Sequence, residues 1–136
     1  MELEELRAET GEKVFEGEGG AYYVWSSSDM ACSNVAAAWL QLQPAGFALP
    51  HYADSHKLGY VLQGTDGLVG MVLPNTTKEI VLSLKKGDVI PVPKGAMSWW
   101  FNPNHSQQPI TIVFLVKLLL SLLSLANSPT SSSLEP

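Results

Sequence analysis

The sequence predicts an all-β fold, an antiparallel sandwich or barrel, on the strength of three observations. Short runs rich in β-branched and aromatic residues recur at roughly 8–12-residue spacing, separated by turn residues. Several of these runs alternate apolar and polar side chains with a period of two, which is typical of half-buried strands. Between residues 20 and 116 no stretch has a helical period. The length of 136 residues suits one domain.

The segment 79–85 has the clearest strand pattern. Its alternate residues Ile80, Leu82 and Leu84 are apolar, which predicts one face turned to a core. The segment 36–43 alternates in the same way, and further strands are predicted at 21–25, 67–73 and 110–116. Turns rich in Gly, Pro, Asn and Asp supply positive or fixed φ angles at 63–67, 73–75, 86–88 and 102–104.

The charge of the chain is concentrated at its start. Residues 1–18 contain seven Glu against Arg7 and Lys13, whereas the rest of the chain is neutral. We therefore expect an acidic lead-in over 1–18 and no surface for nucleic acid. The first residues lack the apolar core of a signal peptide, which predicts a cytoplasmic protein as the chain is written. Cys32 is the only cysteine, so no intrachain disulfide and no cysteine-based zinc site are expected.

The last 20 residues differ from the rest. After the strand 110–116, the residues 117–136 are first leucine-rich and then rich in Ser and Pro. The apolar run 110–126 contains 17 residues with Lys117 in its middle. That run is at the short limit for a membrane span, and a central lysine costs about 2.5–3.5 kcal/mol. We expect a strand, a separate apolar segment over 118–125 and no membrane anchor.

The histidines are the obvious candidates for metal ligands. His51 and His56 are five residues apart, so they face opposite sides of a regular strand and do not form a helical i, i+4 pair. His105 lies among turn residues. On spacing alone the sequence predicts no metal and no other cofactor.

Two longer motifs bear on the same question. Residues 87–102 follow the pattern G-x5-P-x-G-x2-H-x3-N at every spacing, except that Ser98 stands at the histidine position. Residues 46–64 follow G-x5-H-x-H-x(3,4)-E-x6-G with one residue fewer before the first histidine. The chain therefore resembles the cupins, small antiparallel β-barrels or jelly rolls in which these side chains hold one divalent ion.

The resemblance implies which positions once served the metal. His51 occupies the first ligand position, Ala53 the second histidine, Lys57 the glutamate and Ser98 the third histidine. Neither a methyl group nor an ammonium ligates a cation, and a neutral hydroxyl is a weak ligand beside imidazole. The expectation is a vestigial, metal-free site on an intact scaffold, and a protein that is not an enzyme.

Several shorter sequence segments within residues 14–116 resemble those of plant seed-storage globulins of the legumin and glutelin type-D-like kind. AYYVW, the histidine segment, the KKGD–WWFN segment and TIVFLV carry this similarity. It implies a nutrient-reservoir role, a storage vacuole as the compartment if family behaviour applies, and homo-oligomers (dimers or trimers) through barrel faces. Those globulins carry two barrels. Here we expect an acidic lead-in over 1–18, one cupin domain over 19–116, incomplete at its C-terminal end, and a divergent tail over 117–136.

A barrel mouth commonly holds a small ligand. The polar groups His51, Lys57 and Ser98, together with Tyr60 and Trp100, are the predicted lining of such a pocket, with an anionic small molecule as the ligand. Three functions therefore stay open: a storage-type cupin, which the sequence favours, a small-molecule-binding cupin, and a metal-dependent cupin isomerase or oxygenase.

Overall fold

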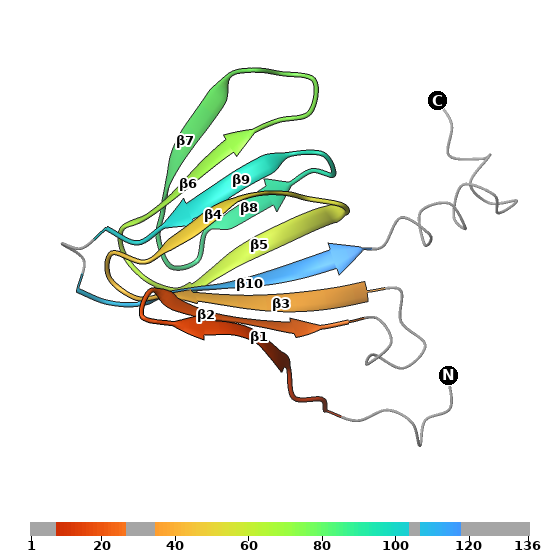
Figure 1. Cartoon of the computed structure of the whole chain (residues 1–136). Helices are drawn as coiled ribbons and strands as arrows, with labels where there is room; N and C mark the ends of the chain where they lie inside the picture. Colours follow the sequence, from red (N-terminus) through yellow and green to blue (C-terminus); the bar gives the residue numbers. More distant parts are fainter. Residues whose placement is uncertain (1–7, 27–34, 104–106, 118–136) are drawn as a thin grey trace, which may run out of the picture.

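The computed structural model describes residues 8–26, 35–103 and 107–117. Cys32, His105 and the tail from residue 118 lie outside these ranges. The described residues form ten strands and contain no helix (Figure 1). The strands are β1 (Glu12–Gly17), β2 (Gly20–Trp25), β3 (Val35–Leu42), β4 (Phe47–Tyr52), β5 (His56–Gln63), β6 (Gly67–Val72), β7 (Glu79–Leu84), β8 (Val89–Val92), β9 (Met97–Phe101) and β10 (Ile110–Lys117).

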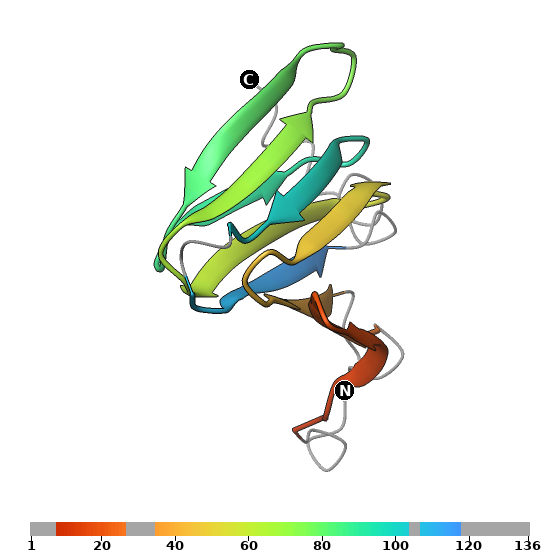
Figure 2. The same cartoon turned by 60° about the vertical axis from the view of Figure 1, so that its left-hand side comes forward.

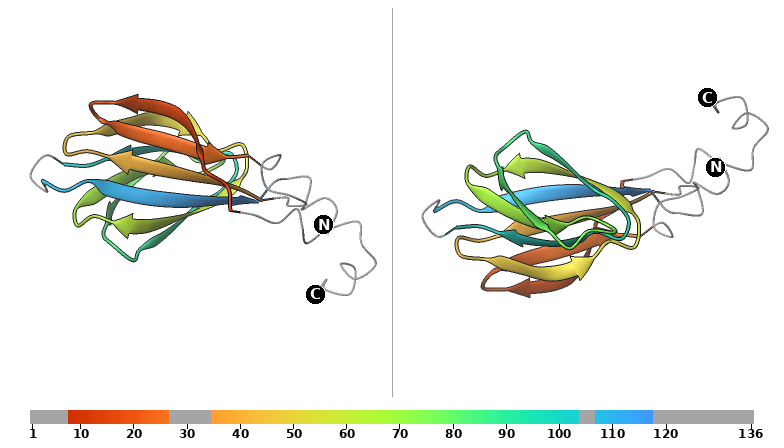
Figure 3. Two further views of the ribbon diagram at one scale, coloured as in Figure 1. Left: turned by 90° about the horizontal axis from the view of Figure 1, so that it is seen from below. Right: turned by 90° about the horizontal axis from the view of Figure 1, so that it is seen from above.

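The strands form two sheets in which every pairing is antiparallel. One sheet has six strands in the order β1-β2-β3-β10-β5-β8, and the other has four in the order β4-β9-β6-β7. β10 lies between β3 and β5, so the last described strand is central in its sheet (Figure 3). Figure 1 places β1 and β7 at opposite ends of the molecule. The predicted all-β, antiparallel jelly roll is confirmed.

The core lies between the two sheets and follows the alternation of the strands. From β3, Leu40 and Leu42 point inward, while Ile112 and Phe114 do so from β10. Trp100 of β9 meets them from the opposite sheet with 1% of its surface exposed. Its ring packs edge-on against that of Phe114 with centroids 5.2 Å apart. The alternation with a period of two therefore determines which side chains of each inner strand are buried.

The bends of the second motif have a structural role. Gly87 and Gly95 adopt φ angles of 93° and 90°, which side chains disfavour. The Gly95 N–H donates to the carbonyl of Ala53 at 2.7 Å, which fixes the bend before β9 against the end of β4. Asn102 is completely buried, and its Nδ2 donates to the carbonyls of Leu42 and Gln108 at 3.0 and 2.7 Å. These residues therefore hold the scaffold together.

The predicted burial of 79–85 is wrong, although the strand itself is present. Ile80 and Leu82 are 42% and 43% exposed, and only Leu84 is buried. β7 is at the edge of the smaller sheet, next to β6 alone, so most of its inner face lies beyond the cover of the other sheet. Alternation identified a strand but not its position in the sheet.

The sheet begins earlier than the predicted domain boundary at residue 19. β1 lies inside the acidic segment and pairs with β2, with a register shift between Lys13 and Phe15. All six β1 residues are exposed. In the described part of the chain, no helix is long and apolar enough to span a membrane.

Candidate functional site

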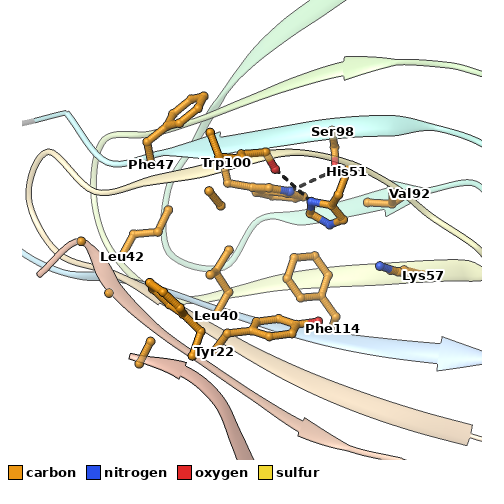
Figure 4. A pocket seen from close by; sticks show the side chains of 16 residues that line it. Tyr22, Leu40, Leu42, Phe47, His51, Lys57, Val92, Ser98, Trp100 and Phe114 are labelled. Atoms are coloured by element: carbon orange, nitrogen blue, oxygen red, sulfur yellow. Dashed lines mark hydrogen bonds between the residues drawn. The ribbon is translucent and has the colours of Figure 1, made fainter. Parts of the chain in front are cut away.

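A cavity of about 550 Å³ lies between the two sheets. Residues of the six-stranded sheet, including Phe15 and Tyr22 of the β1–β2 hairpin, line it on one side, and residues of β4 and β9 line it on the other (Figure 4). Figure 2 shows this hairpin at the margin of the molecule. Near the turns, the Gln43 N–H donates to the Gly19 carbonyl at 2.9 Å. This hydrogen bond joins the segment after β3 to the β1–β2 turn at one side of the cavity.

The walls of the cavity are mainly apolar. Trp100 and Phe114 line it from the two opposite sheets, and Leu40, Leu42 and Val92 line it from β3 and β8. Cavities of roughly 300–1,000 Å³ with apolar walls and a few placed polar groups are typical small-molecule sites. Other lining residues are Phe15, Gly19, Gly20, Ala21, Tyr22, Phe47, Ala48 and Leu49.

The polar groups on the side of β4 and β9 come from one cross-strand pair. His51 of β4 lies directly opposite Ser98 of β9. The His51 Nδ1 is 3.1 Å from the carbonyl oxygen of Leu49, which can only accept, so this nitrogen carries the proton. In the neutral ring Nε2 is then a hydrogen-bond acceptor. The Ser98 hydroxyl is buried and accepts a hydrogen bond from Trp100 Nε1 at 3.1 Å.

Lys57 brings the only ammonium group among the described residues that line the cavity. It enters from β5, where Gly59 and Val61 have the same inward orientation. Burial lowers the pKa of its amine, and the nearby Asp54 carboxylate partly opposes that effect. No described side chain or carbonyl forms a hydrogen bond or ion pair with its Nζ. The cavity therefore contains a half-buried cation that no residue within 8–26, 35–103 or 107–117 neutralises by direct contact.

Tyr22 adds a phenol to the opposite wall (Figure 4). Burial raises the pKa of this phenol, and the Asp54 charge raises it further. The hydroxyl therefore stays protonated well above neutral pH and is able to donate a hydrogen bond. Sequence reasoning missed Tyr22. The aromatic run 21–25 was recognised as a strand, but only pairing with β3 reveals that Tyr22 and Val24 face inward.

Of the five side chains predicted to line a ligand pocket, His51, Lys57, Ser98 and Trp100 border the cavity. The inclusion of Tyr60 was wrong. Tyr60 is three residues after Lys57 on the same strand, so it points to the outer surface, where it is 43% exposed. That a ligand occupies the cavity stays a prediction.

The residues at the four vestigial positions do not fit a metal ion. Ala53 is 4% exposed and packs in the core, and of the four only His51 has a side chain that commonly ligates metals. His56 does not replace a missing ligand, because it points outward and its Nδ1 accepts the Lys94 N–H at 3.2 Å. Within the described ranges, no three His, Cys, Asp or Glu side chains come together as a metal site would require.

The protein combines a jelly-roll fold with the two sequence motifs at residues 46–64 and 87–102, in which only one of four metal-ligating side chains is present. Comparison with protein families agrees with this combination. The family model described as Cupin matches residues 6–118, which is most of the chain. The chain belongs to the cupin family.

The relatives within this family are largely seed globulins. The chain is 25% identical to the 12S seed storage protein CRB of Arabidopsis thaliana over 82% of its own length and 30% of that protein's. Procruciferin, an 11S globulin from Brassica napus, superposes with a TM-score of 0.69 at 27% identity, over 80% of this chain and 30% of that one.

A vicilin from Solanum melongena has the same fold, with a TM-score of 0.67 at 19% identity, over 80% of this chain and 29% of that chain. Its structure revealed different anionic ligands in structurally similar pockets. The chain thus spans about a third or less of the length of these proteins. The predicted resemblance to plant seed-storage globulins is therefore confirmed.

Proposed function

We propose that the protein is a non-catalytic, metal-free cupin of the seed-storage type, acting as a nutrient reservoir and accumulating in storage vacuoles. The observation that carries this proposal is the replacement of three of four metal-ligating side chains by Ala53, Lys57 and Ser98 while the bend residues persist. A lysine ammonium at a ligand position repels a divalent cation. The storage globulins among its relatives support the reservoir role.

Metal analysis of the purified chain tests the absence of a metal centre. After exposure to Mn, Fe and Zn and removal of free metal, we expect far less than one bound ion per chain. Near-stoichiometric Mn or Fe removed by the substitution His51→Ala would contradict the proposal and favour a metal-dependent enzyme. The reservoir role is tested separately by quantifying the protein in vacuolar fractions of maturing and germinating seed, where accumulation followed by loss is expected.

Lys57 supports a second candidate function, the binding of a small amphipathic anion. A carboxylate placed in the cavity would neutralise the Lys57 ammonium, while its apolar part would lie against Trp100 and Phe114. The His51 ring and the Tyr22 hydroxyl offer further polar contacts to such a ligand. The anionic ligands of the Solanum vicilin make this candidate chemically reasonable.

Calorimetric titration with a series of aromatic and aliphatic carboxylates, each beside its neutral amide, tests this candidate. We expect the acids to bind and the amides to bind at least about tenfold more weakly, which is about 1.4 kcal/mol. The substitution Lys57→Met should abolish that preference. Lys86→Met, which removes an exposed cation outside the cavity lining, is the matched control. Equal affinity for acid and amide would contradict a role for the ammonium.

A further inference from the structure

The amine of Lys57 differs in position from the other lysine amines. Its side chain is half-buried and lines the cavity, with the nitrogen directed into it (Figure 4). The other lysines whose exposure the structure describes all lie on the surface, namely Lys13, Lys78, Lys85, Lys86 and Lys94. Among these lysines, only Lys57 therefore meets a ligand inside a cavity rather than in open solvent.

The surroundings of Lys57 favour its neutral form. Burial lowers the pKa of the amine, and the Asp54 carboxylate partly opposes that effect. Among the described residues that line the cavity, the other titratable side chains are Tyr22 of β2 and His51 of β4, and neither is negatively charged at neutral pH. Only the neutral amine has the lone pair that attacks a carbonyl carbon. Lys57 should therefore be a better nucleophile near pH 7 than an exposed lysine.

The walls of the cavity suit a flat, apolar ligand. The rings of Trp100 and Phe114 line it from opposite sheets, and aromatic rings pack favourably against one another. An apolar cavity of about 150 Å³ already holds benzene. The volume here is about 550 Å³, which leaves room for a substituted ring beside the amine. Apolar walls also keep water away from a product that water would hydrolyse.

We propose that Lys57 captures apolar aromatic aldehydes in the cavity as a reversible imine. The nitrogen lone pair forms a bond to the carbonyl carbon and gives a carbinolamine. The carbon–oxygen bond then breaks, and the oxygen leaves as water with both hydrogens of the amine. No oxidant or reductant is required, and water reverses the step. This inference goes beyond the storage role. It shares the cavity with the carboxylate candidate but requires the free amine, whereas a carboxylate requires the ammonium.

Reductive trapping tests the capture. The full chain is incubated near pH 7 with benzaldehyde and cyanoborohydride, which reduces an imine to a stable secondary amine, and peptide mass spectrometry locates the benzyl groups. We expect Lys57 to react at least about tenfold faster than the exposed Lys86 and Lys94, because the cavity positions the aldehyde beside its amine. The α-amino group, whose ordinary pKa is about 8, also reacts and is measured on its own peptide.

Two controls need no variant. In concentrated urea the cavity is lost, so Lys57 should react no faster than Lys86. Glycolaldehyde is small and polar, so the preference for Lys57 should be weaker with it than with benzaldehyde. Equal benzylation of Lys57, Lys86 and Lys94 in the folded chain would overturn the proposal. A preference that persists in urea would do the same.

The substitution Lys57→Arg separates this capture from carboxylate binding. A guanidinium stays protonated and forms no imine here, yet it still pairs with a carboxylate. The rapid benzylation should disappear, while any preference for acids over amides should persist. Lys86→Met is the matched control and should leave benzylation of Lys57 unchanged. Rapid trapping without carboxylate binding would support the imine alone, whereas carboxylate binding without trapping would overturn it. Circular dichroism establishes that both variants are folded.

Discussion

The indole Nε1 of Trp100 donates a hydrogen bond of 3.1 Å to the hydroxyl of Ser98, two residues earlier on β9. Both residues point into the barrel and are nearly completely buried. Ser98 stands at the position that carries the third ligand histidine in the cupin motif. In this chain the side chain at that position accepts a hydrogen bond from a core tryptophan.

Ser98→Ala should destabilise the protein by about 1–3 kcal/mol, because it leaves a buried indole N–H without an acceptor. Urea denaturation measures the change. In a Trp100→Phe background the donor is absent, so the same substitution should cost less than about 0.5 kcal/mol. Equal costs in the two backgrounds would show that the hydrogen bond contributes nothing.

Lys57→Met should stabilise the protein at neutral pH. Burial lowers the folded-state pKa of the amine below its unfolded value, so the folded state carries the cost of a desolvated charge at all pH values below that lowered pKa. As the pH rises from the lowered pKa toward the unfolded one, the unfolded state binds more protons, and the wild-type chain gains stability relative to the variant. Denaturant titrations between pH 7 and pH 10 should therefore converge. A difference that widens with pH would contradict this.

Asn102→Ala should cost about 2–4 kcal/mol, because the carbonyls of Leu42 and Gln108 lose the amide that binds both of them in the protein interior. Asn102→Asp preserves the shape but replaces the NH2 donor with an acceptor facing two carbonyls. It should destabilise at least as much. Equilibrium unfolding measures both variants, and a fully stable aspartate variant would refute a donor role for Asn102.

Gly70→Ala should destabilise the smaller sheet by about 1–3 kcal/mol through overpacking. A Cβ at Gly70 would overlap the indole of Trp99, whose Nε1 donates to Glu79 at 2.8 Å. Fluorescence-monitored unfolding gives the stability and the environment of the indole. Gly19→Ala is the control, because the nearest atom to its added Cβ is 3.6 Å away. It should stay within about 0.5 kcal/mol of the wild type.

The sequence predicted the strands better than their positions. The apolar alternation of β7 is real, yet Ile80 and Leu82 are exposed because β7 ends a sheet. Alternation reports which residues share a face, while burial depends on what covers that face. The covering strands are distant in sequence, so a local pattern does not contain this information.

The candidate site was likewise predicted only in part from the sequence. His51, Lys57, Ser98 and Trp100, which the sequence predicted as pocket residues, border the cavity, and the register of β4 and β9 places His51 opposite Ser98. The prediction that Tyr60 lines the pocket was wrong. Tyr60 is three residues after Lys57 on β5, and residues three apart on a strand face opposite sides. Tyr22 was out of reach, because its inward orientation depends on pairing between β2 and β3.

On one side the cavity is bordered by two strands that form no ladder with one another. β1 ends the larger sheet and β4 ends the smaller one. On this side the width of the chamber is set by side chains such as Phe15 and Leu49 rather than by backbone hydrogen bonds. Substitutions of such side chains therefore change the width of the cavity, and with it the ligands that fit, without breaking the backbone hydrogen bonds of the barrel.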